Sequence, residues 1–205
     1  NNNTVFTDAK IKREIRLKER GLLGSTIFTE KLLQLDRVTI RNLYLRHGYL
    51  ACQVKKDYKR LENNRVNIVF DITEGEQFSL KELKISGSEL FTKEQIDEIL
   101  EIKTNQPYNP FHIEGQIKKL KDQYADNGKP LVNIIDSVFV NNGIHLFLKI
   151  QESSLMKVRK IIIKNYKIIK KPMIAREILL DEGDIYSKEL INRSRKHLFD
   201  SGYFS

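Results

Sequence analysis

Few side chains in this 205-residue sequence are placed where they could carry out chemistry. None of the four histidines, His47, His112, His145 and His197, has a metal-ligating companion at a characteristic short spacing. The single cysteine, Cys52, cannot form an internal disulfide, and we interpret it as a small core residue. We find no P-loop, no catalytic carboxylate pair and no serine, histidine and aspartate order typical of a triad. We therefore expect no enzymatic activity, no bound metal and no cofactor.

One glycine-bracketed loop, Gly21-Leu22-Leu23-Gly24, lies between two predicted helices. RNA-binding KH domains carry a GxxG loop at such a place and clamp the nucleic-acid backbone with it. Here the two middle residues are leucines, whereas phosphate clamping favours basic residues. We interpret Leu22 and Leu23 as anchors of the loop on the domain, and a KH-like RNA-binding array stays the more distant alternative.

The formal net charge of +9 also raises the question of an anionic ligand. The charge is unevenly divided: residues 1–75 carry 15 basic and 9 acidic side chains, residues 76–152 carry 9 and 12, and residues 153–205 carry 12 and 6. A nucleic-acid-binding array would be expected to show a continuous basic stripe with aromatic platforms. The acidic central segment interrupts any such stripe, so we expect no nucleic-acid partner.

A weak internal repeat divides the chain at the same places. Apolar positions, glycines and tyrosines recur after 78 to 80 residues, for example Tyr108 with Tyr186 and Gly48 with Gly128. Because core and turn positions recur while surface residues do not, the pattern predicts a repeated domain rather than a short solenoid repeat. We name the three repeats segment A (1–75), segment B (76–152) and segment C (153–205).

Segment B shows the order β-α-α-β-β from start to finish. A short strand over 80–86 precedes a helix with a capping box from Thr92 to Gln95. A second helix carries an apolar stripe at spacings of four, three and four residues and ends at Asn127-Gly128. Asn141-Asn142-Gly143 predicts the hairpin turn between two final strands, over 132–140 and 144–150.

Segments A and C show parts of the same order. Segment A is expected to lack its first strand, and segment C its C-terminal hairpin. In segment A we expect a second helix over 29–46 and a hairpin over 51–59 and 65–73. In segment C we expect a strand over 158–164, a helix from near Pro172 and a second helix over 187–200.

A set of phrases recurs through the segments in a fixed order. They are HGYLACQV (47–54), DITEG (71–75), ISG (85–87), IAREI (174–178), EGDIY (182–186) and SGYF (201–204). The ordered set resembles the POTRA domains of the BamA/TamA outer-membrane assembly family. The resemblance implies an α+β fold of tandem βααββ modules, each a three-stranded mixed sheet covered on one face by two helices.

The resemblance also implies a function and a place in the cell. Such modules form a periplasmic scaffold, tethered to the outer membrane through a C-terminal β-barrel of the same parent chain. They receive unfolded outer-membrane protein clients and dock accessory assembly lipoproteins. The POTRA part of a secretion or translocation transporter is the alternative.

Free sheet edges are where such a scaffold would take up an extended client, by β-augmentation. In the implied topology the first hairpin strand lies at an edge, here 52–58 in segment A and 132–138 in segment B. Lys55 and Lys56 can limit self-pairing of the first edge, whereas residues 131–140 contain no lysine, so we favour the second as the client edge. The candidate client-binding residues are Val132, Asn133, Ile134, Ile135, Asp136, Ser137, Val138, Cys52, Val54 and Lys56.

Segment C contributes a candidate docking surface for an accessory subunit. Arg176 and Glu182 match the family's Arg-Glu and Glu-Gly motif, which resembles a docking surface in the last module. The alternative interpretation is two solvated surface charges, which is the common state of exposed charged residues.

Overall fold

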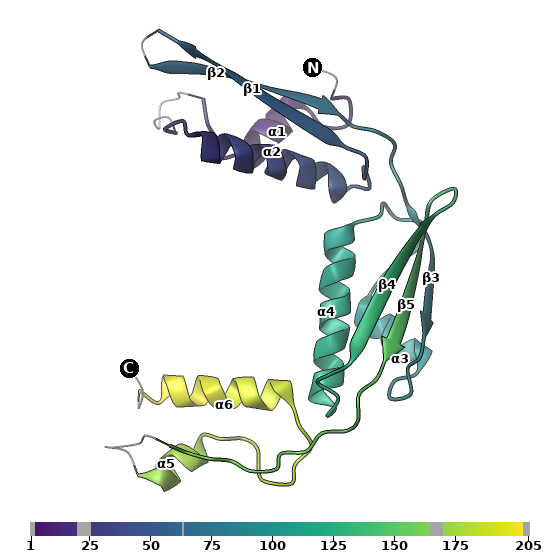
Figure 1. Ribbon diagram of the computed structural model, residues 1–205, viewed down its shortest axis with the longest axis vertical. Coiled ribbons are helices and arrows are strands. Elements are labelled where there is room, and N and C mark those ends of the chain that lie inside the picture. The colour runs from purple at the N-terminus through teal and green to yellow at the C-terminus, as the bar shows by residue number, and fades with distance from the viewer. Residues whose placement is uncertain (1–2, 20–25, 63, 165–169, 203–205) are drawn as a thin grey trace. The chain divides into compact units, whose positions relative to one another are not determined.

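The computed structural model describes residues 3–19, 26–62, 64–164 and 170–202 (Figure 1). These residues form six helices and five strands, which makes the fold α+β. In this part of the chain no helix combines the length and the apolar character that crossing a membrane requires.

The chain forms two compact units, and segments A and C lie in different ones. Unit 1 comprises Asn1–Glu82, Lys103–His112 and Val140–His145. Unit 2 comprises Leu83–Ile102, Ile113–Phe139 and Leu146–Ser205. Each unit therefore takes in a part of segment B.

Segment A forms two helices and a hairpin. The helices are α1 (Asp8–Glu14) and α2 (Glu30–Leu45), each begun by a threonine: the Thr7 hydroxyl accepts from Lys10 N–H and the Thr29 hydroxyl from Leu32 N–H. The strands β1 (Gln53–Leu61) and β2 (Arg65–Thr73) pair antiparallel, from Gln53 opposite Thr73 to Leu61 opposite Arg65. The predicted second helix and hairpin are confirmed, with shifted ends.

The core of segment A lies between its helices and the hairpin. The Tyr44 ring is fully buried and meets the Phe6 ring edge to face at 4.9 Å. Burial of such side chains contributes about 25 cal/mol per Å² of apolar surface removed from water. The buried members of this core are Ile11, Ile40, Leu43, Tyr44, Cys52, Val54 and Ile72.

Segment B supplies a three-stranded sheet and two helices, in the predicted order. Its elements are β3 (Leu80–Ser86), α3 (Lys93–Leu100), α4 (Pro110–Asp126), β4 (Asn133–Val140) and β5 (Ile144–Gln151). The strand order is β3-β5-β4, which puts β4 at one edge (Figure 1). The capping box is confirmed, since the Thr92 hydroxyl accepts from Gln95 N–H and the Gln95 side chain accepts from Thr92 N–H.

The sheet is mixed. Ser79 O accepts from Ile144 N–H at one end of the β3–β5 pair, and Gly87 lies against the Ile150 carbonyl at the other. The two strands therefore run parallel, while the short turn from β4 makes the β4–β5 pair a hairpin. Along β5 every second residue is buried, but on β4 only Ile134 is buried; Val138 and Val140, which lie on the same face of the strand, are 41% and 62% exposed. An edge strand has only one neighbouring strand to cover it, which explains the difference.

Segment C forms two helices, α5 (Lys171–Arg176) and α6 (Lys188–Asp200). The predicted start near Pro172 and the predicted second helix are confirmed. The predicted strand over 158–164 is wrong: the structure assigns no strand there, and a single bridge joins Lys157 and Ile185 nearby. A strand needs the N–H and C=O groups of a neighbour, and no described strand lies alongside these residues.

The connections between successive segments repeat atom for atom. Gly48 O accepts from Phe78 N–H at 2.8 Å, and Phe78 O accepts from Tyr108 N–H at 2.9 Å. In the next connection Gly128 O accepts from Met156 N–H at 2.7 Å, and Met156 O accepts from Tyr186 N–H at 3.0 Å. We call each set of two hydrogen bonds a joint. The sequence repeat of 78 to 80 residues is thus also a repeat of main-chain hydrogen bonds.

Candidate client-binding edges

The predicted edge in segment B is β4. Its strand begins at Asn133, while Val132 lies just before it and donates its N–H to Lys129 O. Ile135 is 42% exposed, and Asp136 and Ser137 are exposed beside it. β4 pairs with β5 alone among the described strands, so its other flank presents unpaired main-chain groups. The structure thus brings the predicted residues 133–138 together on one free edge.

The predicted edge in segment A is β1. Cys52 lies just before the strand and, with Val54, points into the core, so these two residues offer main-chain groups only. Burial raises the pKa of the Cys52 thiol to about 11, which leaves it a poor nucleophile. Lys56 is exposed. The burial of Cys52 confirms its interpretation as a core residue.

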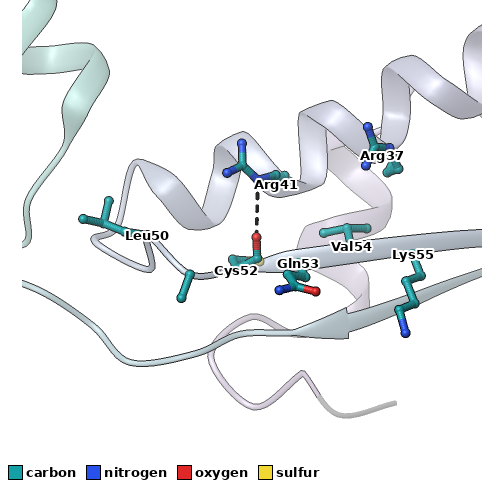
Figure 2. Close-up of a pocket in the computed structure, with 8 residues that line it drawn as sticks. Arg37, Arg41, Leu50, Cys52, Gln53, Val54 and Lys55 are labelled. Atoms are coloured by element: carbon teal, nitrogen blue, oxygen red, sulfur yellow. Dashed lines mark hydrogen bonds between the residues drawn. The ribbon is translucent and has the colours of Figure 1, made fainter.

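A groove that the sequence reasoning missed lies beside the β1 edge (Figure 2). It has a volume of about 440 Å³, and Arg37 and Arg41 contribute to it from α2. The Arg41 Nε donates to the Cys52 carbonyl at 3.3 Å (Figure 2). The lining residues are Arg37, Arg41, Leu50, Ala51, Cys52, Gln53, Val54 and Lys55. The sequence shows two arginines four residues apart, which share one face of a helix, but it does not place that face beside a strand.

The two predicted docking residues lie in different parts of segment C. Arg176 is exposed in the last turn of α5. Glu182 is also exposed, and its Oε1 accepts from Ile161 N–H at 3.0 Å, so this carboxylate already has a partner within the chain. Their role in docking stays a prediction.

A carboxylate clasp recurs at the end of each hairpin. Glu74 accepts from the N–H groups of Thr4 and Val5, at 2.9 and 3.0 Å. Glu152 accepts from the N–H groups of Glu89 and Leu90, at 2.7 and 2.9 Å, and it also pairs with the Lys129 ammonium.

Burial of Glu152 by itself would raise the pKa of its carboxyl. The hydrogen bonds from Leu90, Lys129, Glu89 and Tyr124 outweigh that effect and lower the pKa to about 2. The clasp thus holds the loop before the first helix of segment B against the end of β5, and we assign it a structural role.

Two of the four histidines contact neighbouring side chains. The His47 ring meets the Phe6 ring at 4.9 Å, and His145 Nδ1 lies 3.1 Å from a Glu82 oxygen. Across 3–19, 26–62, 64–164 and 170–202 no three His, Cys, Asp or Glu side chains come together as a metal site would require. The predicted loop anchor at Gly21–Gly24 lies outside the described residues.

Comparison with known sequences gives consistent matches along the chain. The family model for POTRA, the surface antigen variable number repeat, matches residues 1–75, 78–153 and 156–205. A Treponema pallidum (strain Nichols) protein, whose name assigns it to outer membrane protein assembly, is 29% identical over 99% of the chain. The outer membrane protein assembly factor BamA of Nitratidesulfovibrio vulgaris is 22% identical over 98% of it. The chain spans 25% and 27% of these two relatives, about a quarter of each.

Among solved structures, the crystal structure of Haemophilus influenzae BamA POTRA3-5 resembles this fold. The likeness has a TM-score of 0.74 and covers 99% of this chain and 83% of the other, at 18% identity. At 18% sequence identity this similarity is evidence about the fold alone.

Proposed function

Because the chain belongs to the POTRA family of surface antigen variable number repeats, we propose that it is the periplasmic scaffold of an outer-membrane protein assembly factor. The names of the two relatives support this function. In this proposal segments A, B and C are three successive modules, the parent chain anchors them at the outer membrane through a β-barrel, and no step of the function is enzymatic. The repeated joints between the segments support the division into modules.

We propose that unfolded outer-membrane protein clients bind the free edge of β4 as an added strand. The observation that carries this proposal is the position of β4 at the end of the order β3-β5-β4, without a lysine from 131 to 140. An added strand pairs through its main chain, so one edge can take many client sequences. The exposed side chains of Ile135 and Val138 provide apolar contact beside that pairing.

Accessory subunits would dock elsewhere in this proposal. Arg176 on α5 is the exposed charged residue we assign to that contact, together with Glu182. Glu182→Lys would then abolish binding of an accessory lipoprotein while the far-UV circular dichroism stays native. Retained binding would refute the docking role.

The client edge is tested by removing single main-chain donors from β4. Neighbouring N–H groups of a strand point to opposite sides, so we would place proline at Ile135 and, separately, at Asp136. A photo-crosslinker at Ser137 then reports capture of an extended client peptide. We expect one of the two proline variants to lose most of the crosslinking while remaining folded.

The matched control is Ile135→Thr, which keeps the N–H group and changes only the side chain. It should crosslink nearly as well as the unmodified chain. Undiminished crosslinking in both folded proline variants would show that the client does not pair with β4.

A further inference from the structure

We propose that the groove between α2 and β1 binds a carboxylate side chain of an extended client, with Arg37 as its main partner. This inference rests on the proposed function, because it names the side-chain chemistry that one of the two edges selects. The groove in segment A would select clients by charge, whereas the β4 edge in segment B would pair with the main chain of many client sequences.

The first argument is the state of Arg37 itself. Its Nε atom is buried and has no hydrogen-bond partner among the described residues. A guanidinium stays charged in proteins, and an unpaired buried donor costs the desolvation of that group. A buried donor of this kind is rare in native structures, and in this proposal its acceptor arrives with the ligand.

The second argument is that, within the part of the chain that the structure describes, no acidic side chain pairs with the cations of the groove. Asp36, the neighbour of Arg37 in sequence, is fully buried and directed elsewhere. Its two oxygens accept from the N–H groups of Arg16 and Leu17, each at 2.8 Å. The groove lining itself contains Arg37, Arg41 and Lys55 and no Asp or Glu. Its charge complement is therefore an anion.

The third argument places the groove at the free edge of β1. Side chains alternate between the two faces of a strand, and the groove is lined both by the inward-facing Val54 and by its outward neighbours Gln53 and Lys55. No residue of β2, which covers the other edge of β1, takes part in the lining. A cavity that touches both faces and avoids β2 borders the edge that a client strand would occupy.

The fourth argument is the geometry of the ligand that fits. A peptide added along β1 directs alternate side chains toward α2, where the two arginines stand (Figure 2). Arg41 is tied to the Cys52 carbonyl, which keeps its guanidinium beside the strand. Planar guanidinium groups pair with carboxylates through two parallel hydrogen bonds. The occupant is therefore an extended peptide with an aspartate or glutamate at the position facing Arg37.

Segment B has no equivalent of this arginine pair. At the 80-residue repeat, Arg37 and Arg41 correspond to Ile117 and Lys121. Ile117 is buried in the core, so no arginine pair stands beside β4. We therefore expect the two edges to differ, with acid selection confined to segment A.

The test compares two short peptides of alternating threonine and valine, with blocked ends and a neutral fluorophore. They differ in one central residue, glutamate or glutamine. Binding to the full 205-residue chain is followed by fluorescence anisotropy at about 150 mM salt, where distant surface charges are screened. We expect the glutamate peptide to bind about ten-fold more tightly or better.

The variant Arg37→Gln should remove that preference and leave binding of the glutamine peptide unchanged. Arg65→Gln, an exposed arginine of the same hairpin outside the groove, removes the same charge and should keep the preference. Arg37→Lys should retain part of it, because the charge stays while the paired hydrogen bonds are lost. Circular dichroism establishes that each variant is folded.

The outcomes separate this inference from the function it rests on. Equal binding of both peptides overturns the carboxylate site and leaves the client edges standing. Binding of neither peptide overturns both proposals. If Arg65→Gln and Arg37→Gln both lose the preference for the glutamate peptide, that preference comes from the general charge of the segment, and the site is overturned. Displacement of both peptides by submillimolar inorganic phosphate, or by vesicles of anionic lipid, likewise overturns the assignment to a peptide carboxylate.

Discussion

Replacing one oxygen of the Glu152 carboxylate by an amide nitrogen should change the free energy of unfolding by an amount that the structure lets us work out. Its side chain is only 7% exposed and accepts from the N–H groups of Glu89 and Leu90 and from Lys129. Glu152→Gln keeps the shape but removes the charge, and it turns an amide N–H₂ toward groups that donate. Donors that lose a buried carboxylate partner are costly to leave unpaired.

The magnitude follows from the pKa of the same carboxyl. Folding lowers the pKa of Glu152 from its ordinary value of 4.5 to about 2. Such a shift corresponds to about 3 kcal/mol of stability contributed by the ionised form. Because the folded pKa is the lower one, this contribution is complete above pH 4.5 and is lost as the pH falls from there toward 2. The variant should therefore be about 3 kcal/mol less stable at neutral pH and nearly equal to the unmodified chain at about pH 2.

Urea unfolding at neutral pH, at about pH 4 and at about pH 2.5 measures this difference by circular dichroism. Hydrogen exchange over residues 86–95 reports the clasp directly, since that segment contains both amide donors. Glu98→Gln, an exposed carboxylate on α3, is the matched control and should change stability little at any pH. A neutral-pH difference below about 1 kcal/mol, or one that does not shrink in acid, would refute this account of the clasp.

Two further predictions concern other parts of the structure. Gly48→Ala should destabilise segment A by about 1–3 kcal/mol, because Gly48 has φ +88° and an added Cβ would lie 2.4 Å from Phe78 O. Gly115→Ala is its control: with nothing within 4 Å in α4, it should stabilise by about 0.5–1 kcal/mol, and thermal unfolding that ranks the two alike would contradict this reasoning. Cys52, with its pKa raised to about 11, should react with a thiol reagent at about pH 8 only after urea unfolding, so prompt labelling of the native chain would show that it is not buried.

The features that local chemistry determines could be predicted from the sequence. The capping box at Thr92 and Gln95 needs only neighbours in one turn, and it forms as expected. The same holds for the hairpin turn at Asn142 and Gly143, which have φ of 50° and 129°. Both residue types tolerate positive φ, so the turn could be predicted without knowledge of any tertiary contact.

The features that depend on distant partners were harder to predict. Residues 158–164 have strand-like sequence, but no described strand pairs with them. Val138 lies on the same face of β4 as the buried Ile134 and is nevertheless exposed, because β4 lies at an edge.

The groove that Arg37 and Arg41 line could not be predicted for the same reason, because it too depends on a distant element. Arg37 and Arg41 are ordinary helix residues in the sequence, and they acquire meaning only when the fold places α2 beside the first residues of β1. Of the candidate site, the edge strands could thus be predicted, and the charged groove beside one of them could not.

The joints have a consequence for how such an array can change in evolution. Each is made of main-chain N–H and C=O groups, with Gly48 or Gly128 at its first position. Side chains elsewhere can therefore drift without breaking it, provided that the glycine stays. Duplication of one segment would copy an acceptor at one end and a donor at the other, so a new repeat could join its neighbours on both sides at once. The number of repeats can then grow or shrink by gene duplication and deletion, without a new interface each time.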